Sequence, residues 1–153
     1  MRIYLVQHGE AASEDVDPKR PLTEKGRQDV ERVAEFMKAA CVSVERVFQS
    51  GKLRAEQTAD IFARATSKGK PEKREGLKPN DEPDPAGEEF AKWNEDLMLV
   101  GHLPFMSRLV SVLTTGEAVV PIAAFQPGSV VCLERGEADG WAIDWMVRPE
   151  LLK

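Results

Sequence analysis

The chain has 153 residues, of which 42% are hydrophobic and 31% charged, and a formal net charge of −5. This length and composition predict a single globular domain, spanning residues 1–153, that is large enough to bury a core. The acidic balance argues against nucleic acid or an anionic membrane as the main partner, although it leaves room for a local basic pocket that binds phosphate.

The cysteines and the apolar segments indicate a reducing compartment. Cys41 and Cys132 are too few for a disulfide framework, and the hydrophobic run around Cys132 favours a buried thiol. The first strand pattern begins at residue 2, which leaves no room for a signal peptide, and no apolar run reaches the length of a membrane span. We therefore expect a cytoplasmic protein.

The first half of the chain alternates between strand and helix patterns. The apolar run at 3–7 predicts a buried strand, and apolar residues at helical spacing predict a helix over 23–40 with Thr23 as its N-cap. A weaker strand pattern over 44–50 is followed by a helix pattern over 52–65. Such alternation is typical of a sheet with parallel strands.

The middle of the chain begins with a segment rich in turn-forming residues. Residues 67–87 hold four prolines and three glycines among charged residues, which predicts a surface loop. Apolar residues over 90–97 indicate a short helix before a strand that ends at His102. Pro104 suits the first position of the next helix, which we expect to reach Gly116.

The last third of the chain contains short strand patterns separated by turns. They cover 119–125, 129–134 and 141–147, and alternate residues of 141–147 predict one strongly apolar face. The whole order predicts an α/β fold. We expect a three-layer sandwich in which helices flank a mostly parallel central sheet, with some antiparallel pairing at the end.

The chain has only two histidines, His8 and His102, and each follows a short apolar run. Ligands of open α/β sheets bind beyond the carboxyl ends of the strands. One strand-end histidine alone is more often a loop residue held by hydrogen bonds. Because both histidines share this setting, we expect them to lie together at the site of chemistry.

Basic residues occupy comparable places. Arg20 lies in the loop after the first strand, whereas Lys52 and Arg54 lie at the start of the helix predicted over 52–65. A helix N-terminus attracts anions, and the planar guanidinium matches phosphate oxygens. Arg54 alone would more often be a solvated surface residue. Beside two strand-end histidines, they favour a phosphoryl pocket.

The chemistry of phosphoryl transfer then suggests a role for each histidine and arginine. Phosphoryl transfer depends on positioning and on neutralising charge, and an imidazole held in one tautomer is a competent nucleophile. One histidine can attack phosphorus while the other, with Arg20 and Arg54, holds the oxygens. Two histidines far apart in sequence make a poor metal site, and Glu10 is more plausibly an exposed carboxylate than a third ligand. We expect no metal or other cofactor.

Four segments, in order, resemble the motifs of the histidine phosphatase superfamily, whose fold is that of phosphoglycerate mutase. The matching sequences are LVQHGEA at 5–11, RPLTEKG at 20–26, SGKLRAEQT at 50–58 and VGHLP at 100–104. The short length and the Trp-rich final strand most resemble the SixA branch of phosphohistidine phosphatases.

The resemblance implies a role for each matching residue. His8 would be the nucleophile that becomes phosphorylated, with Gly9 letting the chain turn and approach the site closely. Arg20, Arg54 and His102 would bind the phosphoryl oxygens. For Ser50 we expect a structural role, as the cap of the helix that bears Arg54.

Gln7 departs from the family pattern, which has arginine before the nucleophile. Its amide keeps donors but lacks the positive charge, and charged hydrogen bonds are roughly twice as strong as neutral ones. We therefore expect weaker binding or slower turnover, with Arg20 and Lys52 as possible compensation. A phosphate-binding module with little or no activity is an alternative.

The leaving group narrows the substrate. A phosphate ester needs a general acid, whereas a departing imidazole can be protonated by water. The loop predicted over 67–87 offers Glu75, Asp81, Glu82 and Asp84, which have no distinctive setting and are expected to be solvated. We therefore expect an open site that removes phosphate from phosphohistidine of a partner protein, such as a phosphotransfer domain. A small-molecule phosphomonoesterase is the second enzymatic alternative.

Overall fold

A computed structural model of the protein describes residues 1–152. Its strands form one six-stranded sheet in the order β3-β2-β4-β1-β5-β6. The strands are β1 (Arg2–Gln7), β2 (Arg46–Gln49), β3 (Glu72–Lys73), β4 (Leu97–Gly101), β5 (Val130–Arg135) and β6 (Trp141–Val147). The first four in chain order pair in parallel, while β5 and β6 are antiparallel to their neighbours.

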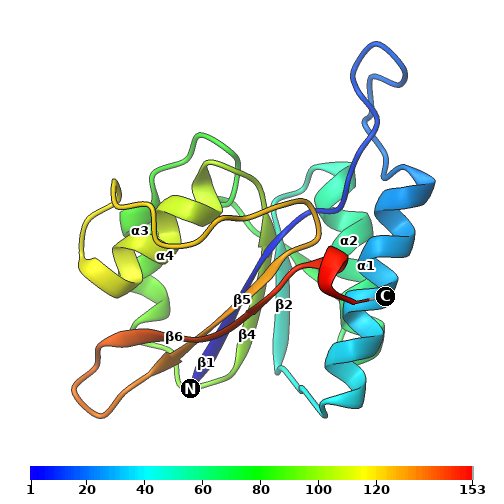
Figure 1. The fold of residues 1–153 in the computed structure, drawn as a ribbon. Helices are drawn as coiled ribbons and strands as arrows, with labels where there is room; N and C mark the ends of the chain where they lie inside the picture. The colour runs from blue at the N-terminus through cyan, green and yellow to red at the C-terminus, as the bar shows by residue number, and fades with distance from the viewer. Residues whose placement is uncertain (153) are drawn as a thin grey trace.

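Helices cover both faces of this sheet (Figure 1). They are α1 (Glu24–Ala39), α2 (Leu53–Thr66), α3 (Pro83–Phe90) and α4 (Phe105–Thr115), followed by the 3-10 turn η1 (Pro149–Leu151). The helices α1 and α2 pack on one face, and α3 and α4 on the other. The predicted three-layer α/β sandwich with a mostly parallel sheet is therefore confirmed.

Strand β1 shows why its apolar run is continuous. Tyr4 and Val6 pack into the core beneath α1 and α2, whereas Ile3 and Leu5 pack into the core beneath α3 and α4. All four side chains are at most 2% exposed. A strand buried on both faces needs hydrophobic residues at every position.

The start of α1 matches its prediction and shapes the site. The Thr23 hydroxyl accepts a hydrogen bond from the Gly26 N–H at 2.9 Å, as an N-cap should. A Cβ at Gly26 would lie 2.1 Å from the Glu10 carbonyl oxygen, so only glycine fits. The first turn of α1 therefore presses directly against the loop that follows β1.

The prediction of a loop over 67–87 is wrong in two places. Residues Glu72–Lys73 form the edge strand β3, and α3 begins at Pro83 inside the supposed loop. Proline is favoured in the first turn of a helix because its missing N–H has no intrahelical partner there. The proline thus starts a helix, which ends at the buried Phe90, and no separate helix covers 90–97.

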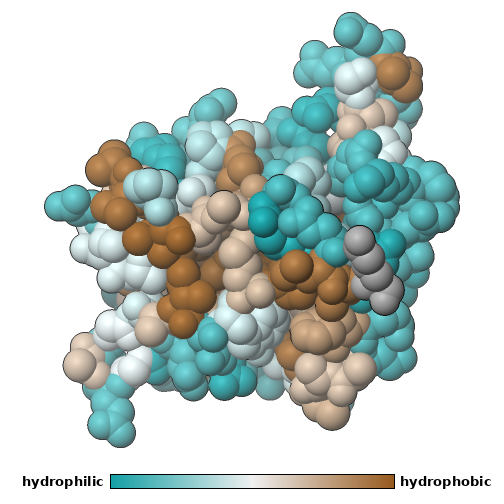
Figure 2. Space-filling model, in the orientation of Figure 1, coloured by the Kyte–Doolittle hydropathy of each residue, from teal (hydrophilic) through white to brown (hydrophobic). Residues whose placement is uncertain are grey.

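The predicted strand over 119–125 is also absent from the described sheet, since residues 117–129 follow an irregular path after α4. Pro121 and Pro127 lack the N–H that a sheet position requires. Figure 2 shows apolar side chains gathered over this segment, where Val119 and Ile122 are exposed. Pro104 is the N-cap of α4 rather than its first residue, and Gly116 ends that helix with a φ of 83°.

The single apolar face expected for 141–147 is wrong because of a β-bulge. The register between β5 and β6 shifts at Cys132 and Leu133. As a result, Trp141 joins the core beneath α3 and α4, whereas Trp145 and Val147 pack with the core beneath α1 and α2. A bulge adds one residue to a strand and reverses the side-chain alternation beyond it.

Two smaller expectations can be checked against the same structure. The Cys132 thiol is fully buried, as predicted, and burial raises its pKa to about 12. Cys41 is exposed, and both thiols are free. Across residues 1–152, none of the helices combines the length and apolar character needed to cross a bilayer.

Candidate active site

Parallel pairing of β1 with β4 brings the two histidines together. Gln7 pairs with Gly101 in the strand register, so His8 and His102 follow the same rung of the ladder. The His8 N–H donates to the Gly101 carbonyl at 2.9 Å. The two imidazole ring centroids lie 5.0 Å apart, with the ring planes tilted by 53°.

The His8 ring is held in one orientation by its own backbone neighbour. Its Nδ1 lies 2.7 Å from the Gly9 carbonyl oxygen, which can only accept a hydrogen bond. The proton is therefore on Nδ1, and Nε2 keeps a free lone pair. Burial lowers the pKa of His8 to about 4, Arg54 and Arg20 act in the same direction, and the Gly9 carbonyl opposes them. At neutral pH the ring is uncharged and nucleophilic.

Gly9 connects this ring to α1 and α2. Its φ is not positive, so the expected turn is not the reason for glycine here. A Cβ would lie 2.7 Å from Val30 Cγ2 in α1, which only a hydrogen at that position avoids. The Gly9 N–H donates to the Thr58 hydroxyl at 3.0 Å, and this hydroxyl donates to the Arg54 carbonyl at 2.7 Å.

Sequence reasoning did not single out Thr58 for this connecting role. Its only signal was its place in the segment at 50–58, four residues after Arg54. Residues at that spacing share a helix face. The spacing does not show which distant segment this face contacts, which in the structure is the backbone at Gly9.

His102 is almost fully buried, with 1% of its surface exposed. Burial lowers its pKa to about 3, and the nearby positive groups contribute in the same direction. Its Nε2 lies 2.6 Å from the Ser50 hydroxyl oxygen. Its Nδ1 is buried and has no hydrogen-bond partner among the described residues.

The expected role of Ser50 as a helix cap is wrong. Lys52 is the N-cap of α2, and its side chain makes no capping bond. The Ser50 hydroxyl accepts a hydrogen bond from the Lys52 N–H at 3.3 Å, but Lys52 precedes the first helical residue. The shorter hydrogen bond of this hydroxyl is with His102. The strand order explains this, because β2 lies next to β4 and Ser50 follows β2.

Arg54 lies in the first turn of α2, where unpaired N–H groups attract anions. Its Nε is buried and, within residues 1–152, has no hydrogen-bond partner. Burial lowers the pKa of the guanidinium, Arg20 adds to this by repulsion, and Glu14 acts in the opposite direction. A partly buried cation with an unused donor is an arrangement that an anion would complete.

Arg20 approaches the same group of residues from the projecting loop that precedes α1 (Figure 1). Its φ of 50° lies in the left-handed region, which is unusual for a residue with a side chain. Its Nε donates to the Ala12 carbonyl at 2.9 Å, which orients the guanidinium. The positive charge of Arg20 acts on Arg54, His8 and His102, so the structure brings together the four predicted charged or ionisable residues.

Gln7 is 7% exposed, and its Oε1 has no partner in the described part of the chain. It is the third buried polar group near the two rings that lacks a partner, together with Arg54 Nε and His102 Nδ1. Native proteins leave few such atoms unpaired. Their concentration beside one pair of strands is typical of a binding site.

The acidic residues of 67–87 lie among basic groups of their own region. Glu75 lies 3.7 Å from both Lys73 and Lys78, and Glu82 lies 3.2 Å from Arg108. Asp81 accepts the Lys78 N–H, and Asp84 lies in the first turn of α3.

Possible metal ligands do not gather in this structure. Among residues 1–152, no group of three or more His, Cys, Asp or Glu side chains is placed to hold a metal ion. Glu10, considered from the sequence as a third metal ligand, lies 3.7 Å from the Lys25 ammonium group.

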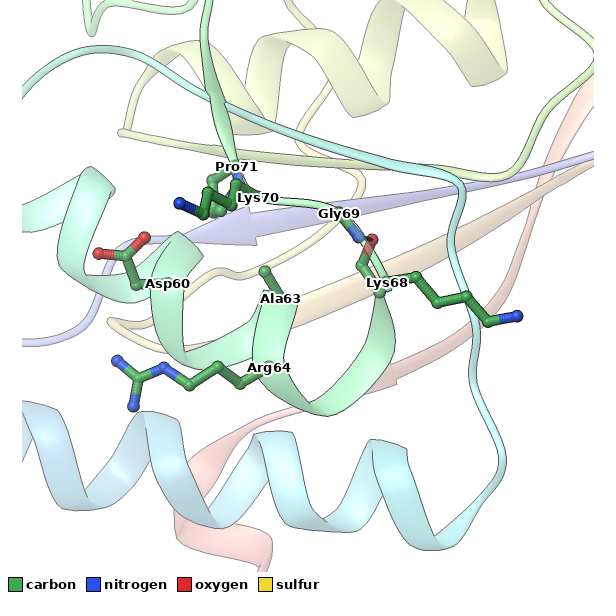
Figure 3. A pocket seen from close by; sticks show the side chains of 8 residues that line it. Asp60, Ala63, Arg64, Lys68, Gly69, Lys70 and Pro71 are labelled. Atoms are coloured by element: carbon green, nitrogen blue, oxygen red, sulfur yellow. Dashed lines mark hydrogen bonds between the residues drawn. The ribbon is translucent and has the colours of Figure 1, made fainter.

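A hollow of about 460 Å³ lies at the opposite end of α2 (Figure 3). Its lining includes Asp60, Arg64, Lys68 and Lys70 and contains neither histidine. The last turn of a helix carries partial negative charge, which nearby cations offset. The basic residues of this hollow therefore have a structural explanation, and the histidine pair remains the candidate active site.

Comparisons with known proteins agree with this geometry. Residues 3–99 match the sequence profile of the histidine phosphatase superfamily (branch 1). The chain is 29% identical to phosphohistidine phosphatase SixA of Escherichia coli (strain K12), over 100% of this chain and 97% of that protein.

Solved structures give the same result for the fold. A structure of the protein histidine phosphatase SixA complexed with tungstate matches with a TM-score of 0.88 and 26% identity, covering 100% of both chains. A phosphoserine phosphatase mutant from Entamoeba histolytica matches in fold, with a TM-score of 0.77, 13% identity and 99% of both chains covered. This protein belongs to the histidine phosphatase superfamily.

Proposed function

We propose that this protein removes the phosphoryl group from phosphohistidine of a partner protein, through a phosphorylated His8. The observation that carries the proposal is the pair of uncharged imidazoles, with centroids 5.0 Å apart, beside the unpartnered Arg54 Nε. The 29% identity to a phosphohistidine phosphatase over the full chain supports the choice of substrate class.

In the first step, His8 Nε2 attacks phosphorus with its lone pair. A new N–P bond forms on His8 as the N–P bond to the substrate imidazole breaks. The departing ring takes a proton from water, so this step needs no placed acid. Arg20, Arg54 and His102 hold the phosphoryl oxygens, whose negative charge spreads over the group during transfer.

In the second step, a water molecule attacks the phosphorus of phosphorylated His8. The His8 N–P bond breaks, inorganic phosphate leaves, and Nε2 regains its lone pair. The low pKa of His8, about 4, keeps the free ring unprotonated for the next cycle at neutral pH. The Gly9 carbonyl holds the Nδ1 proton throughout, so the same nitrogen reacts each time.

We propose that the reaction needs no metal ion. Two guanidinium groups, the N-terminus of α2 and the nearby Lys52 supply positive charge for the phosphoryl group. Activity that survives prolonged dialysis against a chelator would agree with this, whereas activity that returns only on adding a divalent cation would contradict it. We further propose that residues 1–153 act as a single catalytic domain in the cytoplasm.

A small-molecule phosphomonoesterase is the second candidate. An ester leaving group requires a proton donor. Glu14 is the acidic side chain whose charge acts on Arg54, which makes it the carboxyl group to test for that role. The unpartnered Gln7 favours a third candidate, a phosphate-binding module with little turnover.

The experiment compares the three candidates directly. A histidine-phosphotransfer domain carrying radiolabelled phosphohistidine is incubated with the protein, and an alkyl phosphate and an aryl phosphate are tested in parallel. We expect release of phosphate from the protein substrate and a trapped phosphoenzyme whose phosphate is acid-labile and alkali-stable. His8→Ala should reduce both signals by about 10³-fold or more.

Other outcomes assign the other functions. Rapid turnover of alkyl phosphates that falls with Glu14→Gln would favour the phosphomonoesterase. Tight binding of tungstate without release of phosphate or a trapped phosphoenzyme would favour the binding module. Full activity of His8→Ala would reject His8 as the nucleophile.

A further inference from the structure

We infer that Ser50 sets the tautomer of His102, so that Nδ1 carries the proton and donates it in a hydrogen bond to the phosphoryl group. Ser50 is thus a positioning residue, which acts on the substrate through His102. The part of the inference that concerns the phosphoryl group rests on the proposed function, whereas the tautomer is a property of the free protein.

The hydrogen bonds around Ser50 leave its proton one destination. The side chain is 0% exposed, so water does not complete its bonding. Its Oγ contacts two groups among the described residues, the Lys52 N–H at 3.3 Å and His102 Nε2 at 2.6 Å. The Lys52 N–H is a donor, so the hydroxyl must accept from it. The hydroxyl proton therefore points to Nε2.

The opposite tautomer would leave groups unpaired on both sides of this contact. If Nε2 carried the proton, the Ser50 hydroxyl hydrogen would have no acceptor among residues 1–152. Within the described part of the chain, the Nδ1 lone pair would also stay unpaired, whereas the Nδ1–H tautomer leaves a single buried group of this pair unpaired, the Nδ1–H itself. An unpaired buried polar group costs free energy comparable to a lost hydrogen bond, so the Nδ1–H tautomer is favoured. A neutral imidazole carries one N–H. If Nε2 accepts a hydrogen bond from the Ser50 hydroxyl, the N–H of the ring must therefore be on Nδ1.

The Nδ1 proton is the useful one for phosphate chemistry. His102 Nδ1 is buried without a partner in the described residues, and it belongs to a ring 5.0 Å from the nucleophilic ring. A phosphoryl oxygen accepts hydrogen bonds and would be repelled by a bare lone pair on Nδ1. Burial keeps the pKa of His102 at about 3 in the free protein, so the ring that meets the anion at neutral pH is uncharged and carries a single N–H. The tautomer has to supply the donor.

The chain is well suited to a direct test, since it contains only two histidines. Nitrogen NMR of protein labelled on the imidazole nitrogens distinguishes a protonated nitrogen from a bare one, and His8→Gln assigns the His102 signals. At pH 7 we expect Nδ1–H for His102 in the unmodified protein. In Ser50→Ala we expect a shift toward Nε2–H, the form that free histidine prefers in water. Ser50→Thr, which keeps the hydroxyl, should retain Nδ1–H.

A second readout measures the consequence for anion binding. Ser50→Ala should weaken binding of tungstate by about tenfold to a hundredfold, because a donor to a charged group becomes a lone pair. Ser50→Thr should bind with near-normal affinity. The matched control is Ser111→Ala in α4, which removes an equally buried hydroxyl, bonded to Glu117 and Val120. It should lower stability without changing either the tautomer or the tungstate affinity.

The outcomes separate this inference from the proposed function. Nε2–H in the unmodified protein, or an unchanged tautomer in Ser50→Ala, would overturn the inference even if phosphohistidine is hydrolysed. The predicted tautomers and tungstate affinities without any turnover of phosphohistidine would uphold the inference and reject the proposed function. A change of tautomer with unchanged tungstate affinity would overturn the claim that Nδ1 binds the phosphoryl group.

Discussion

Two groups of arginines on the same half of the sheet differ in how their charges are used. In the cluster beside β2 and β3, Arg46 makes two hydrogen bonds of 2.9 Å to the Glu72 carboxylate. Arg74 pairs with Glu89 and lies over the rings of Phe48 and Phe90, 5.0 and 5.2 Å from their centroids. The protein itself provides the partners of both guanidinium groups.

At the candidate active site, residues 1–152 provide no partner for the buried Nε of Arg54. Burial lowers the pKa of Arg54, and the largest effect of a charged neighbour on this pKa is repulsion from Arg20. The same residue type thus has a structural role in one place and an open binding capacity in the other. The comparison teaches that residue identity marks a candidate, whereas several unpaired buried polar groups close together mark the candidate ligand site. A single unpaired group in the described residues, such as Arg148 Nε, does not.

Truncating one arginine from each group gives the sharpest test of this comparison. Arg54→Ala should lower kcat/KM for phosphohistidine by about 10²–10³-fold, because a donor to the developing charge is lost. It should leave thermal stability unchanged or slightly higher, since the repulsion with Arg20 disappears. Steady-state kinetics and a thermal melt measure the two effects.

Arg74→Ala is the matched control and should behave in the opposite way. We expect about 1–2 kcal/mol less free energy of unfolding, from lost contacts with aromatic rings, and kcat/KM within about twofold of the unmodified protein. The comparison breaks if Arg74→Ala abolishes activity at full stability, or if Arg54→Ala leaves kcat/KM unchanged.

The substitution Gln7→Arg tests whether the candidate active site lacks one positive charge. Gln7→Arg should raise kcat/KM by about tenfold, because a charged donor replaces a neutral one. The free protein should become less stable, since a third guanidinium joins Arg20 and Arg54, and tungstate should restore the lost stability. Enzyme kinetics together with melts with and without tungstate check this prediction.

The control at this position is Gln7→Met, which has a similar size but no amide. It should be at least as stable as the unmodified protein, because the unpaired buried Oε1 disappears. Unaltered kinetics in Gln7→Arg, with no more stabilisation by tungstate than in the unmodified protein, would show that this position lies outside the anion pocket.

The pH dependence of stability tests the burial of the two imidazoles without any substitution. In the folded protein the pKa values of His8 and His102 are about 4 and about 3, whereas an unfolded histidine titrates near 6.5. The unfolded chain therefore binds more protons between these values. Stability should be greatest above about pH 6.5 and should decrease as the pH falls. The apparent melting temperature should drop by on the order of 10 °C between pH 7 and 5.

Scanning calorimetry at constant ionic strength measures this slope. A variant with both histidines replaced by glutamine should lose most of it. A melting temperature that stays flat from pH 7 to 5 in the unmodified protein would contradict the burial of neutral rings.

The histidine pair was predictable because parallel strands place their carboxyl ends at one edge of a sheet. The strands ending at Gln7 and Gly101 are apolar and continuous, so their pattern indicated burial on both faces. The N-cap Thr23 was predictable for a similar reason, because the capping bond spans only three residues. Local rules were enough in these places.

Contacts between distant segments were not predictable in the same way. The contact of Ser50 with His102 depends on β2 lying next to β4. Local sequence patterns do not predict the order of strands in a sheet. The bulge at Cys132 likewise depends on pairing with β6. In 67–87, the prolines led to the prediction of a loop, but Pro83 is the first residue of α3. Proline is common both in loops and in the first turn of a helix, so its presence alone does not distinguish them.

The Thr58 hydroxyl has a mechanical consequence for the catalytic cycle. Because it links the Gly9 amide to the Arg54 carbonyl, we expect the backbone beside the proposed nucleophile His8 and the helix turn that carries Arg54 to shift together as one body. Any motion that opens or tightens the phosphoryl pocket therefore has to come from outside this body. The projecting loop that ends at Arg20 lies outside this body, and we expect such motion to come from it.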